Sequence, residues 1–202
     1  MKKFMYIYFA FFFVTACKQQ GDDVDAFRGK YIDKIEKYTI IAEDGSRYEM
    51  NEKNVDKIYY LIRHAEKDTV KSPDPVLSFN GELRSTKLAE ILWNTKLDAV
   101  YSTMTTRCLF TVDSIADTRH LSIIPYEPKG MKEVIAKIRN DSKQNKILIV
   151  GHSNTTPVLA NYIYGTDYFK KIFDESDYDN FIVVMENKDK TKTILPLKYK
   201  FY

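Results

Sequence analysis

The chain has 202 residues, of which 44% are hydrophobic and 29% charged, and this composition excludes a disordered or low-complexity protein. Its 31 Lys and Arg residues against 28 Asp and Glu give a net charge of +3, which is too balanced to favour nucleic-acid binding through bulk charge. Two cysteines exclude a disulfide framework. A length of this order suits a single domain with a tail.

The first 16 residues have the pattern of an export signal. Lys2 and Lys3 precede an uncharged apolar run over residues 4–14, which as a helix spans roughly half of a bilayer core. The run therefore predicts a signal peptide and not a membrane span. It ends in Val14-Thr15-Ala16-Cys17, which resembles the lipobox of bacterial lipoproteins. That resemblance implies cleavage before Cys17 and acylation of its thiol and amino group. An ordinary signal that contains a cysteine, or a buried N-terminal helix, is the alternative.

Three parts are predicted along the chain. Residues 1–16 are the lipoprotein signal peptide, residues 17–30 a tether, and residues 31–202 a single domain. The polar stretch 18–25 is typical of a linker. Once Cys17 carries lipid, Cys108 is the remaining thiol, and we expect it to be buried as a small hydrophobic residue.

Strand patterns recur through the predicted domain. The runs 37–42 and 47–50 flank Asp44-Gly45 and predict a hairpin. Further strands are predicted, in chain order, at residues 58–62, 97–101, 121–126, 147–150, 181–185 and 193–199. The last two are joined by a turn at residues 188–190, so they form a closing hairpin.

Helix patterns alternate with these strands. A helix follows Gly81, and a second covers residues 104–116 with Ser102 or Thr103 as its N-cap. A third has apolar residues at positions 131, 134, 135 and 138, on one helix face, and a fourth spans residues 155–163. The alternation predicts an α/β fold: a three-layer sandwich with a mainly parallel central sheet, helices on both faces and antiparallel edge strands.

Polar residues follow four of the predicted strands. Arg63 and His64 follow one strand, residues 102–107 the next, Glu127 the third and residues 151–154 the fourth. Because the carboxyl ends of parallel strands meet at the same edge of a sheet, and ligands bind there, we expect these groups to converge. The third histidine of the chain, His120, is instead typical of a solvated turn.

The converging side chains suit phosphoryl chemistry. Two guanidiniums, from Arg63 and Arg107, present paired donors to a phosphate dianion. A neutral imidazole attacks phosphorus and carries the phosphoryl group as a covalent intermediate. A second imidazole binds the developing charge, and a carboxylic acid protonates the leaving oxygen.

Four motifs resemble the histidine phosphatase superfamily, which includes the phosphoglycerate mutases. Residues 61–67, LIRHAEK, resemble its Arg-His-Gly/Ala signature, and residues 77–81, LSFNG, resemble the start of its first helix. Residues 100–112, with Tyr101-Ser102 and Arg107, are similar to its next segment, and residues 149–154, IVGHSN, to its second histidine motif. The order and spacing agree with the superfamily from about residue 57 to residue 165.

The resemblance implies particular roles for residues of this chain. His64 is then the phosphorylated nucleophile, while Arg63, Arg107 and His152 hold the phosphoryl group. The general acid is expected after the third strand, at Glu127. Two other carboxylates, Glu66 and Glu133, remain alternatives for that role. The superfamily needs no metal or other cofactor.

We therefore expect a phosphomonoester phosphatase of the cell envelope, lipid-anchored on a periplasmic or surface face. Its substrate is a phosphorylated small molecule or a phosphoprotein, and no nucleic acid is implied. One alternative is a non-catalytic lipoprotein that binds an anion on the same scaffold. Another is a metal-dependent hydrolase with His64, Glu66 and His152 as ligands.

Overall fold

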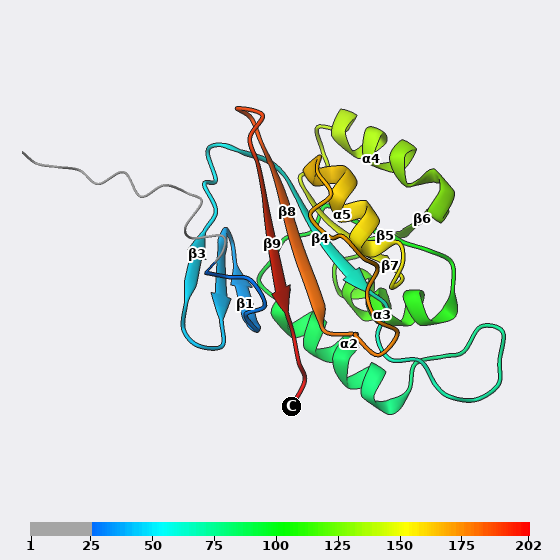
Figure 1. Ribbon diagram of the computed structural model, residues 1–202. Helices are drawn as coiled ribbons and strands as arrows, with labels where there is room; N and C mark the ends of the chain where they lie inside the picture. Colours follow the sequence, from blue (N-terminus) through cyan, green and yellow to red (C-terminus); the bar gives the residue numbers. More distant parts are fainter. Residues whose placement is uncertain (1–25) are drawn as a thin grey trace, which may run out of the picture.

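The computed structural model describes residues 26–202 (Figure 1). The predicted signal peptide, the lipidation site Cys17 and most of the predicted tether therefore lie outside the described residues. From Phe27 onward the chain packs on the domain, because the Phe27 ring is buried and meets the edge of Tyr48 at a centroid distance of 5.7 Å. Within residues 26–202, no helix has the length and apolar character needed to cross a membrane.

A six-stranded sheet forms the centre of the domain. Its strands are β4 (Val55–Arg63), β5 (Ala99–Ser102), β6 (Ile123–Pro125), β7 (Lys146–Gly151), β8 (Asn180–Asn187) and β9 (Lys192–Lys198). They lie in the order β6-β5-β7-β4-β8-β9. The first four are parallel, and β8 and β9 are antiparallel to their neighbours. The predicted mixed sheet with a closing antiparallel hairpin is confirmed.

Helices cover both faces of this sheet, as predicted (Figure 1). One face is covered by α2 (Phe79–Ile91) and α3 (Thr106–Thr118), and the other by α4 (Met131–Asn140) and α5 (Thr156–Tyr164). A short 3₁₀ helix, η1 (Pro128–Gly130), precedes α4. Alternate residues of β4 enter the two cores, with Tyr60 in the α2–α3 core and Tyr59 in the α4–α5 core. Both faces of the strand are buried over residues 58–62, which explains the apolar run there.

A second, smaller sheet packs beside the first on its α2 side (Figure 1). It consists of β1 (Ile32–Glu36), β2 (Thr39–Ala42) and β3 (Arg47–Glu49), all antiparallel. The hairpin around Asp44-Gly45 is confirmed, with Gly45 at a φ of 82° that suits glycine. Strand β1 was not predicted. Its Ile32 and Ile35 are fully buried in the same core as α2, so the small sheet is an integral part of the domain.

Candidate active site

The two histidines of the predicted site lie side by side because their strands are parallel neighbours. Arg63 at the end of β4 is in register with Gly151 at the end of β7. The backbone N–H of His64 donates to the Gly151 carbonyl at 2.9 Å. The imidazole rings of His64 and His152 consequently have centroids 5.4 Å apart. The expected convergence is present for the ends of β4 and β7.

A cavity of about 450 Å³ opens at this edge of the sheet. It is lined by His64, Lys67, Thr105, Arg107, Pro128, His152, Ser153, Asn154, Thr155, Ile172 and Glu175. A larger hollow of about 600 Å³ lies near the opposite ends of the strands, between the C-termini of α2 and α3, and it contains no histidine. The chemistry of the lining therefore selects the smaller cavity.

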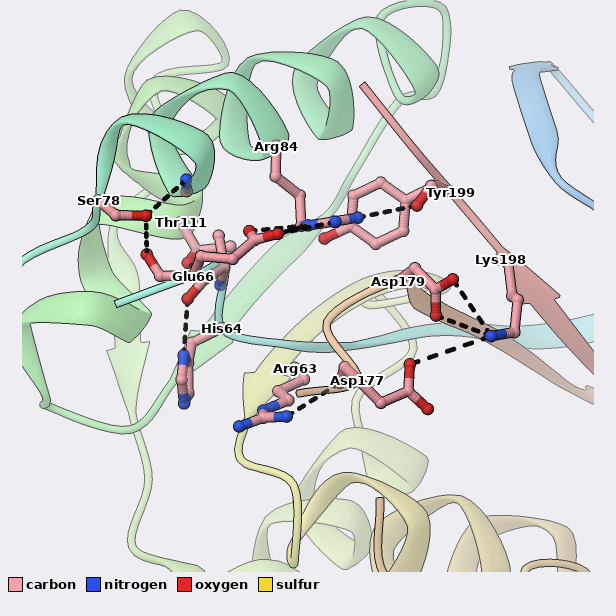
Figure 2. A network of polar contacts seen from close by, with 12 residues as sticks. Arg63, His64, Glu66, Ser78, Arg84, Thr111, Asp177, Asp179, Lys198 and Tyr199 are labelled. Carbon is pink, nitrogen blue, oxygen red and sulfur yellow. Dashed lines mark hydrogen bonds and ion pairs between the residues drawn. The ribbon is translucent and has the colours of Figure 1, made fainter. Parts of the chain in front are cut away.

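The tautomer of His64 is set by a backbone carbonyl. Nδ1 lies 2.8 Å from the carbonyl oxygen of Ala65, which can only accept, so Nδ1 carries the hydrogen and Nε2 keeps its lone pair. The N–H of Ala65 in turn donates to Thr111 Oγ1 of α3 at 2.9 Å. The backbone of Ala65, itself fixed by α3, therefore holds the ring in one orientation (Figure 2).

Burial keeps the His64 ring neutral. The residue is 4% exposed, and burial lowers its pKa to about 3, with the positive charges of Arg63 and Arg107 acting in the same direction. The hydrogen bond to Ala65 opposes this shift. At neutral pH Nε2 is therefore an unprotonated nitrogen on a ring that feels the positive charge of two guanidiniums.

His152 is less buried and has a side-chain partner. Its Nε2 lies 2.9 Å from Thr103 Oγ1, and its backbone N–H donates to Thr155 Oγ1. Burial, and then the charges of Arg107 and Arg63, lower the pKa of His152 to about 4. Cys108 is buried beneath it, as expected for a small hydrophobic residue. Both imidazoles are thus neutral at neutral pH.

Arg63 is fixed by the segment that precedes β8. Its Nη1 donates to the carbonyls of Asp174 and Asp177 at 2.8 and 2.9 Å (Figure 2 shows the second contact). Its Nη2 pairs with a carboxylate oxygen of Glu175 at 3.0 Å, and Tyr178 lies against the guanidinium plane. The side chain is fully buried, and its Nε has no partner among the described residues. A buried donor of this kind favours an anionic ligand.

Arg107 projects from the first turn of α3 into the cavity. Its Nη1 lies 3.3 Å from the carboxylate of Asp74. Its Nε is also buried without a hydrogen-bond partner in the described part of the chain. Two buried guanidinium N–H groups, on Arg63 and on Arg107, thus remain to be satisfied at one end of the sheet.

The N-cap predicted for α3 was wrong. The cap residue is Thr105, and its side chain makes no capping bond. Ser102 Oγ donates to the carbonyl of Thr103, while Thr103 is engaged with His152. The N-terminus of α3 is instead satisfied by Asp74, which accepts from the N–H of Thr106. Sequence proximity failed here because the loop after β4 supplies the acceptor from a distance of 32 positions.

The carboxylates predicted as acids differ in their surroundings. Glu127 is exposed and does not line the cavity, although its neighbour Pro128 does. Glu133 is exposed in the first turn of α4. Glu66 pairs with Arg84, which also donates to the carbonyl of Tyr199 (Figure 2). Glu66 thus fastens its loop to α2 and the C-terminal segment.

Sequence reasoning missed Glu175, whose side chain lines the cavity. It lies in the irregular segment 165–179 between α5 and β8, where no periodic pattern or motif marks a functional residue. Its carboxylate accepts from Ser153 Oγ as well as from Arg63. Within residues 26–202, no three His, Cys, Asp or Glu side chains gather so as to hold a metal ion.

The fold resembles those of several solved structures, three of which are named as phosphatases. The α-ribazole phosphatase from Shigella flexneri shares 15% identity with a TM-score of 0.58, over 70% of this chain and 96% of that one. The protein histidine phosphatase SixA, solved with tungstate, shares 14% identity with a TM-score of 0.55, over 68% and 93%. A mycobacterial glucosyl-3-phosphoglycerate phosphatase with inorganic phosphate shares 9% identity with a TM-score of 0.55, over 72% and 98%. At such identities the likeness shows the fold.

A family model supplies the sequence link. Residues 59–128 match the histidine phosphatase superfamily (branch 1). This range contains the first histidine motif and Arg107, and the shared fold extends beyond it. No curated protein matches the chain in sequence. Over residues 59–128 the chain is therefore similar in sequence to the histidine phosphatase superfamily.

Proposed function

We propose that the protein is a phosphomonoester phosphatase that works through a phosphohistidine intermediate on His64. The observation that carries this proposal is the orientation of one ring. His64 Nδ1 is bonded to the Ala65 carbonyl, and the nucleophilic Nε2 is left on a ring that lines a cavity with Arg107 and His152. Neutral imidazoles are nucleophiles, and the low pKa of His64 keeps this one neutral across the physiological range.

The reaction has two displacements at phosphorus. In the first, the Nε2 lone pair of His64 forms a bond to phosphorus while the bond to the ester oxygen breaks, and that oxygen takes up a proton from an acid and leaves as the alcohol. In the second, a water oxygen attacks phosphorus, the P–N bond breaks, and inorganic phosphate is released with His64 restored. Each step forms one bond to phosphorus and breaks another without a change of oxidation state, so no redox partner is needed.

Three cationic or donating groups stabilise the phosphoryl oxygens. Arg63 and Arg107 supply charge and the buried Nε donors that have no other partner among residues 26–202. His152, neutral beforehand, gains a proton as the dianion approaches, because two negative charges outweigh the effect of burial. The charged ring then donates to an equatorial oxygen as negative charge develops in the transition state.

Comparisons support the ligand class. Two of the similar folds were solved with an oxyanion, tungstate in one and inorganic phosphate in the other. The names of these relatives give substrates that range from a protein to a small phosphorylated metabolite. We therefore propose a phosphorylated small molecule or a phosphoprotein as the substrate of this chain.

The proposed location is the cell envelope, and it rests on the sequence of the first 17 residues. A lipid on Cys17 would hold the domain at a membrane, because each buried CH₂ contributes about 0.8 kcal/mol. An exported enzyme meets phosphomonoesters outside the cytoplasm, such as sugar phosphates, phosphorylated envelope components or exported phosphoproteins.

Substitution of the nucleophile tests the activity. We expect His64→Asn to abolish hydrolysis of p-nitrophenyl phosphate by the purified domain while its circular dichroism spectrum is retained. The matched control is His120→Asn, because His120 is exposed and has a φ of 52°, which asparagine tolerates. Rapid acid quench of the wild type should also trap an acid-labile phosphate that His64→Asn lacks. Full activity of His64→Asn would remove the residue from the mechanism.

A wild-type protein that hydrolyses no phosphomonoester but binds inorganic phosphate would favour the alternative, a non-catalytic anion-binding lipoprotein. A screen of the wild type against sugar phosphates, aryl phosphates and phosphopeptides separates these cases. The same screen assigns the substrate class, because it compares turnover across leaving groups of different size.

A further inference from the structure

A carboxylate is placed where the leaving group of the proposed reaction must depart. Among the described residues, Glu175 is the one Asp or Glu side chain that lines the cavity with the two histidines. Its oxygens are held from two sides, by Arg63 Nη2 at 3.0 Å and by Ser153 Oγ. Its side chain is nevertheless 73% exposed. The group is therefore anchored at the mouth of the cavity and free on its solvent side.

The positions of nucleophile and carboxylate fit an in-line displacement. His64 is 4% exposed and lies at the floor of the cavity. Attack by its Nε2 requires the leaving oxygen on the opposite side of phosphorus, which is the direction of the mouth. Glu175 is the acidic side chain at that mouth within residues 26–202.

We propose that Glu175 is the general acid and base of this site: its carboxylic acid protonates the leaving oxygen, and its carboxylate then activates the attacking water. This inference rests on the proposed phosphatase function. It replaces Glu127, which is exposed and outside the cavity lining. It also excludes Glu66 from the role, because Arg84 holds that carboxylate by three contacts from its Nε and Nη2 atoms.

The proton reaches Glu175 with the substrate. Before binding, Ser153 and Arg63 keep the pKa of the Glu175 carboxyl below its usual range, so it is ionised. A phosphate monoester has a second pKa near 6 and enters partly as the monoanion. The phosphoryl group becomes a dianion among Arg63, Arg107 and His152. It then competes with Glu175 for the Arg63 guanidinium, and its negative charge repels the Glu175 carboxylate. Transfer of the ester proton to Glu175 relieves this repulsion.

Atoms and charges balance over both steps. In the first, the proton of Glu175 goes to the ester oxygen as the P–O bond breaks, so the neutral alcohol departs and Glu175 is left as carboxylate. In the second, Glu175 takes a proton from water while the water oxygen bonds to phosphorus and the bond to His64 Nε2 breaks. Phosphate leaves, and that proton returns to it or to solvent.

Substrates with different leaving groups test the assignment. The variant Glu175→Gln keeps the size and one acceptor oxygen of the side chain but has no proton to give. We expect it to lower kcat/KM for an alkyl phosphate, such as glycerol phosphate, by about 10²–10⁴-fold. Its effect on p-nitrophenyl phosphate should be small, because the nitrophenolate leaves without a proton. Glu175→Asp, which retains an acid on a shorter side chain, should recover part of the alkyl phosphatase activity.

A control in the same segment accounts for charge alone. Asp167→Asn removes one negative charge from segment 165–179 at an exposed position outside the cavity. It should leave the ratio of alkyl to aryl turnover unchanged. Near-ultraviolet circular dichroism of each variant confirms that the domain remains folded.

Two outcomes would overturn the assignment. An equal loss on alkyl and aryl phosphates in Glu175→Gln would show that Glu175 only positions Arg63. The leaving-group dependence appearing in Glu127→Gln would return the acid to the position expected from the sequence. If the wild type hydrolyses no phosphomonoester, the phosphatase proposal is contradicted, and the proposed role of Glu175 is contradicted with it.

Discussion

His64 and His152 are both held in their neutral form by the same surroundings. Each ring is withdrawn from water, and each lies near two arginines, so each is held in its neutral form. In the proposed mechanism, neutral His64 is the nucleophile, and neutral His152 takes a proton when a dianion arrives. The cost is that protonation of either ring opposes folding.

This cost predicts a pH dependence of stability. In the unfolded chain both histidines titrate near 6.5, whereas in the folded chain their pKa values are about 3 and about 4. The unfolded state therefore binds more protons between those values, and the free energy of unfolding falls as pH falls below 6.5. From pH 7.5 to 5.5 we expect a loss of about 1 kcal/mol for each histidine.

Urea unfolding at pH 7.5 and pH 5.5 measures this difference. The variant His152→Asn should lose about 1 kcal/mol less than the wild type over that interval. Ordinary carboxylates titrate near pH 4, so they contribute little in this window. Equal losses in the wild type and His152→Asn would show that His152 titrates normally in the folded chain.

At the residue scale, the sequence predicted the positions of the residues that directly follow buried strands, but not those of residues in irregular segments. Arg63, His64 and His152 were placed correctly because each follows an apolar run that is unmistakably a buried strand. Glu175 and Asp74 come from irregular segments, and their contacts depend on how those segments fold back over the sheet. No local pattern encodes such a path, so neither residue stood out.

At the element scale, the loop after β4 is tied to α2 by backbone contacts. The N–H of Ser78 donates to the carbonyl of Glu66 at 2.9 Å. Ser78 Oγ accepts from the N–H of Gly81, the contact that Figure 2 shows. A Cβ on Gly81 would lie 2.1 Å from that same Glu66 oxygen. Glycine at this position therefore lets α2 begin directly against the backbone that follows His64.

Substitution of Gly81 by alanine should be destabilising and should lower activity. Alanine favours a helix over glycine by about 1 kcal/mol, yet the clash with Glu66 has to move backbone atoms, and such overpacking costs roughly 1–3 kcal/mol. The displaced loop carries Ala65, whose carbonyl orients His64. We therefore expect a net loss in urea unfolding together with a lower kcat.

The control for this variant is Gly130→Ala. A Cβ at Gly130 would have one neighbour within 4 Å, a carboxylate oxygen of Glu133 at 3.9 Å. Its effect on the free energy of unfolding should stay within about 0.5 kcal/mol. If Gly81→Ala has wild-type stability and activity, the loop after β4 can move to accommodate the new Cβ without displacing His64.

Helices and strands were predicted correctly where burial gives the sequence a regular apolar pattern, and they were missed where it does not. The four helices and the central strands follow from 3.6-residue spacing and apolar runs, and all were found near their expected positions. Strand β1 was missed because its sequence, IDKIE, buries only Ile32 and Ile35 and shows neither strict alternation nor a continuous apolar run. The strand forms because it pairs with β2 of the neighbouring hairpin.

At the scale of the whole molecule, the fold concentrates its polar chemistry at one end of a parallel sheet. Arg63 and His64 follow β4, Arg107 follows β5, and His152 follows β7. The antiparallel pair β8 and β9 adds no strand end to this group, but the segment that precedes β8 brings Glu175 and the carbonyls that hold Arg63. Residues of all these segments come together around one cavity. The order of the parallel strands alone accounts for the position of most of these residues.

Attachment to a membrane is the property of the whole protein that the N-terminal sequence predicts. In the full-length chain expressed in a bacterium with a lipoprotein pathway, Cys17→Ser should move the protein from the membrane fraction to the soluble fraction. Loss of a signal from metabolically incorporated palmitate should accompany the change, because the thiol is the acceptor of one acyl group. Cys108→Ser is the matched control, since these are the two cysteines of the chain and Cys108 is buried in the domain.

The two cysteine variants separate lipid anchoring from other causes of sedimentation. A domain that merely aggregates would pellet in both variants and would not be extracted by mild detergent. A lipid-anchored domain would be extracted from membranes in the wild type and in Cys108→Ser, and it would be soluble without detergent in Cys17→Ser. Membrane attachment that persists in Cys17→Ser would contradict anchoring through that thiol. It would leave the proposed phosphatase activity untouched, because that activity depends on the domain and not on the anchor.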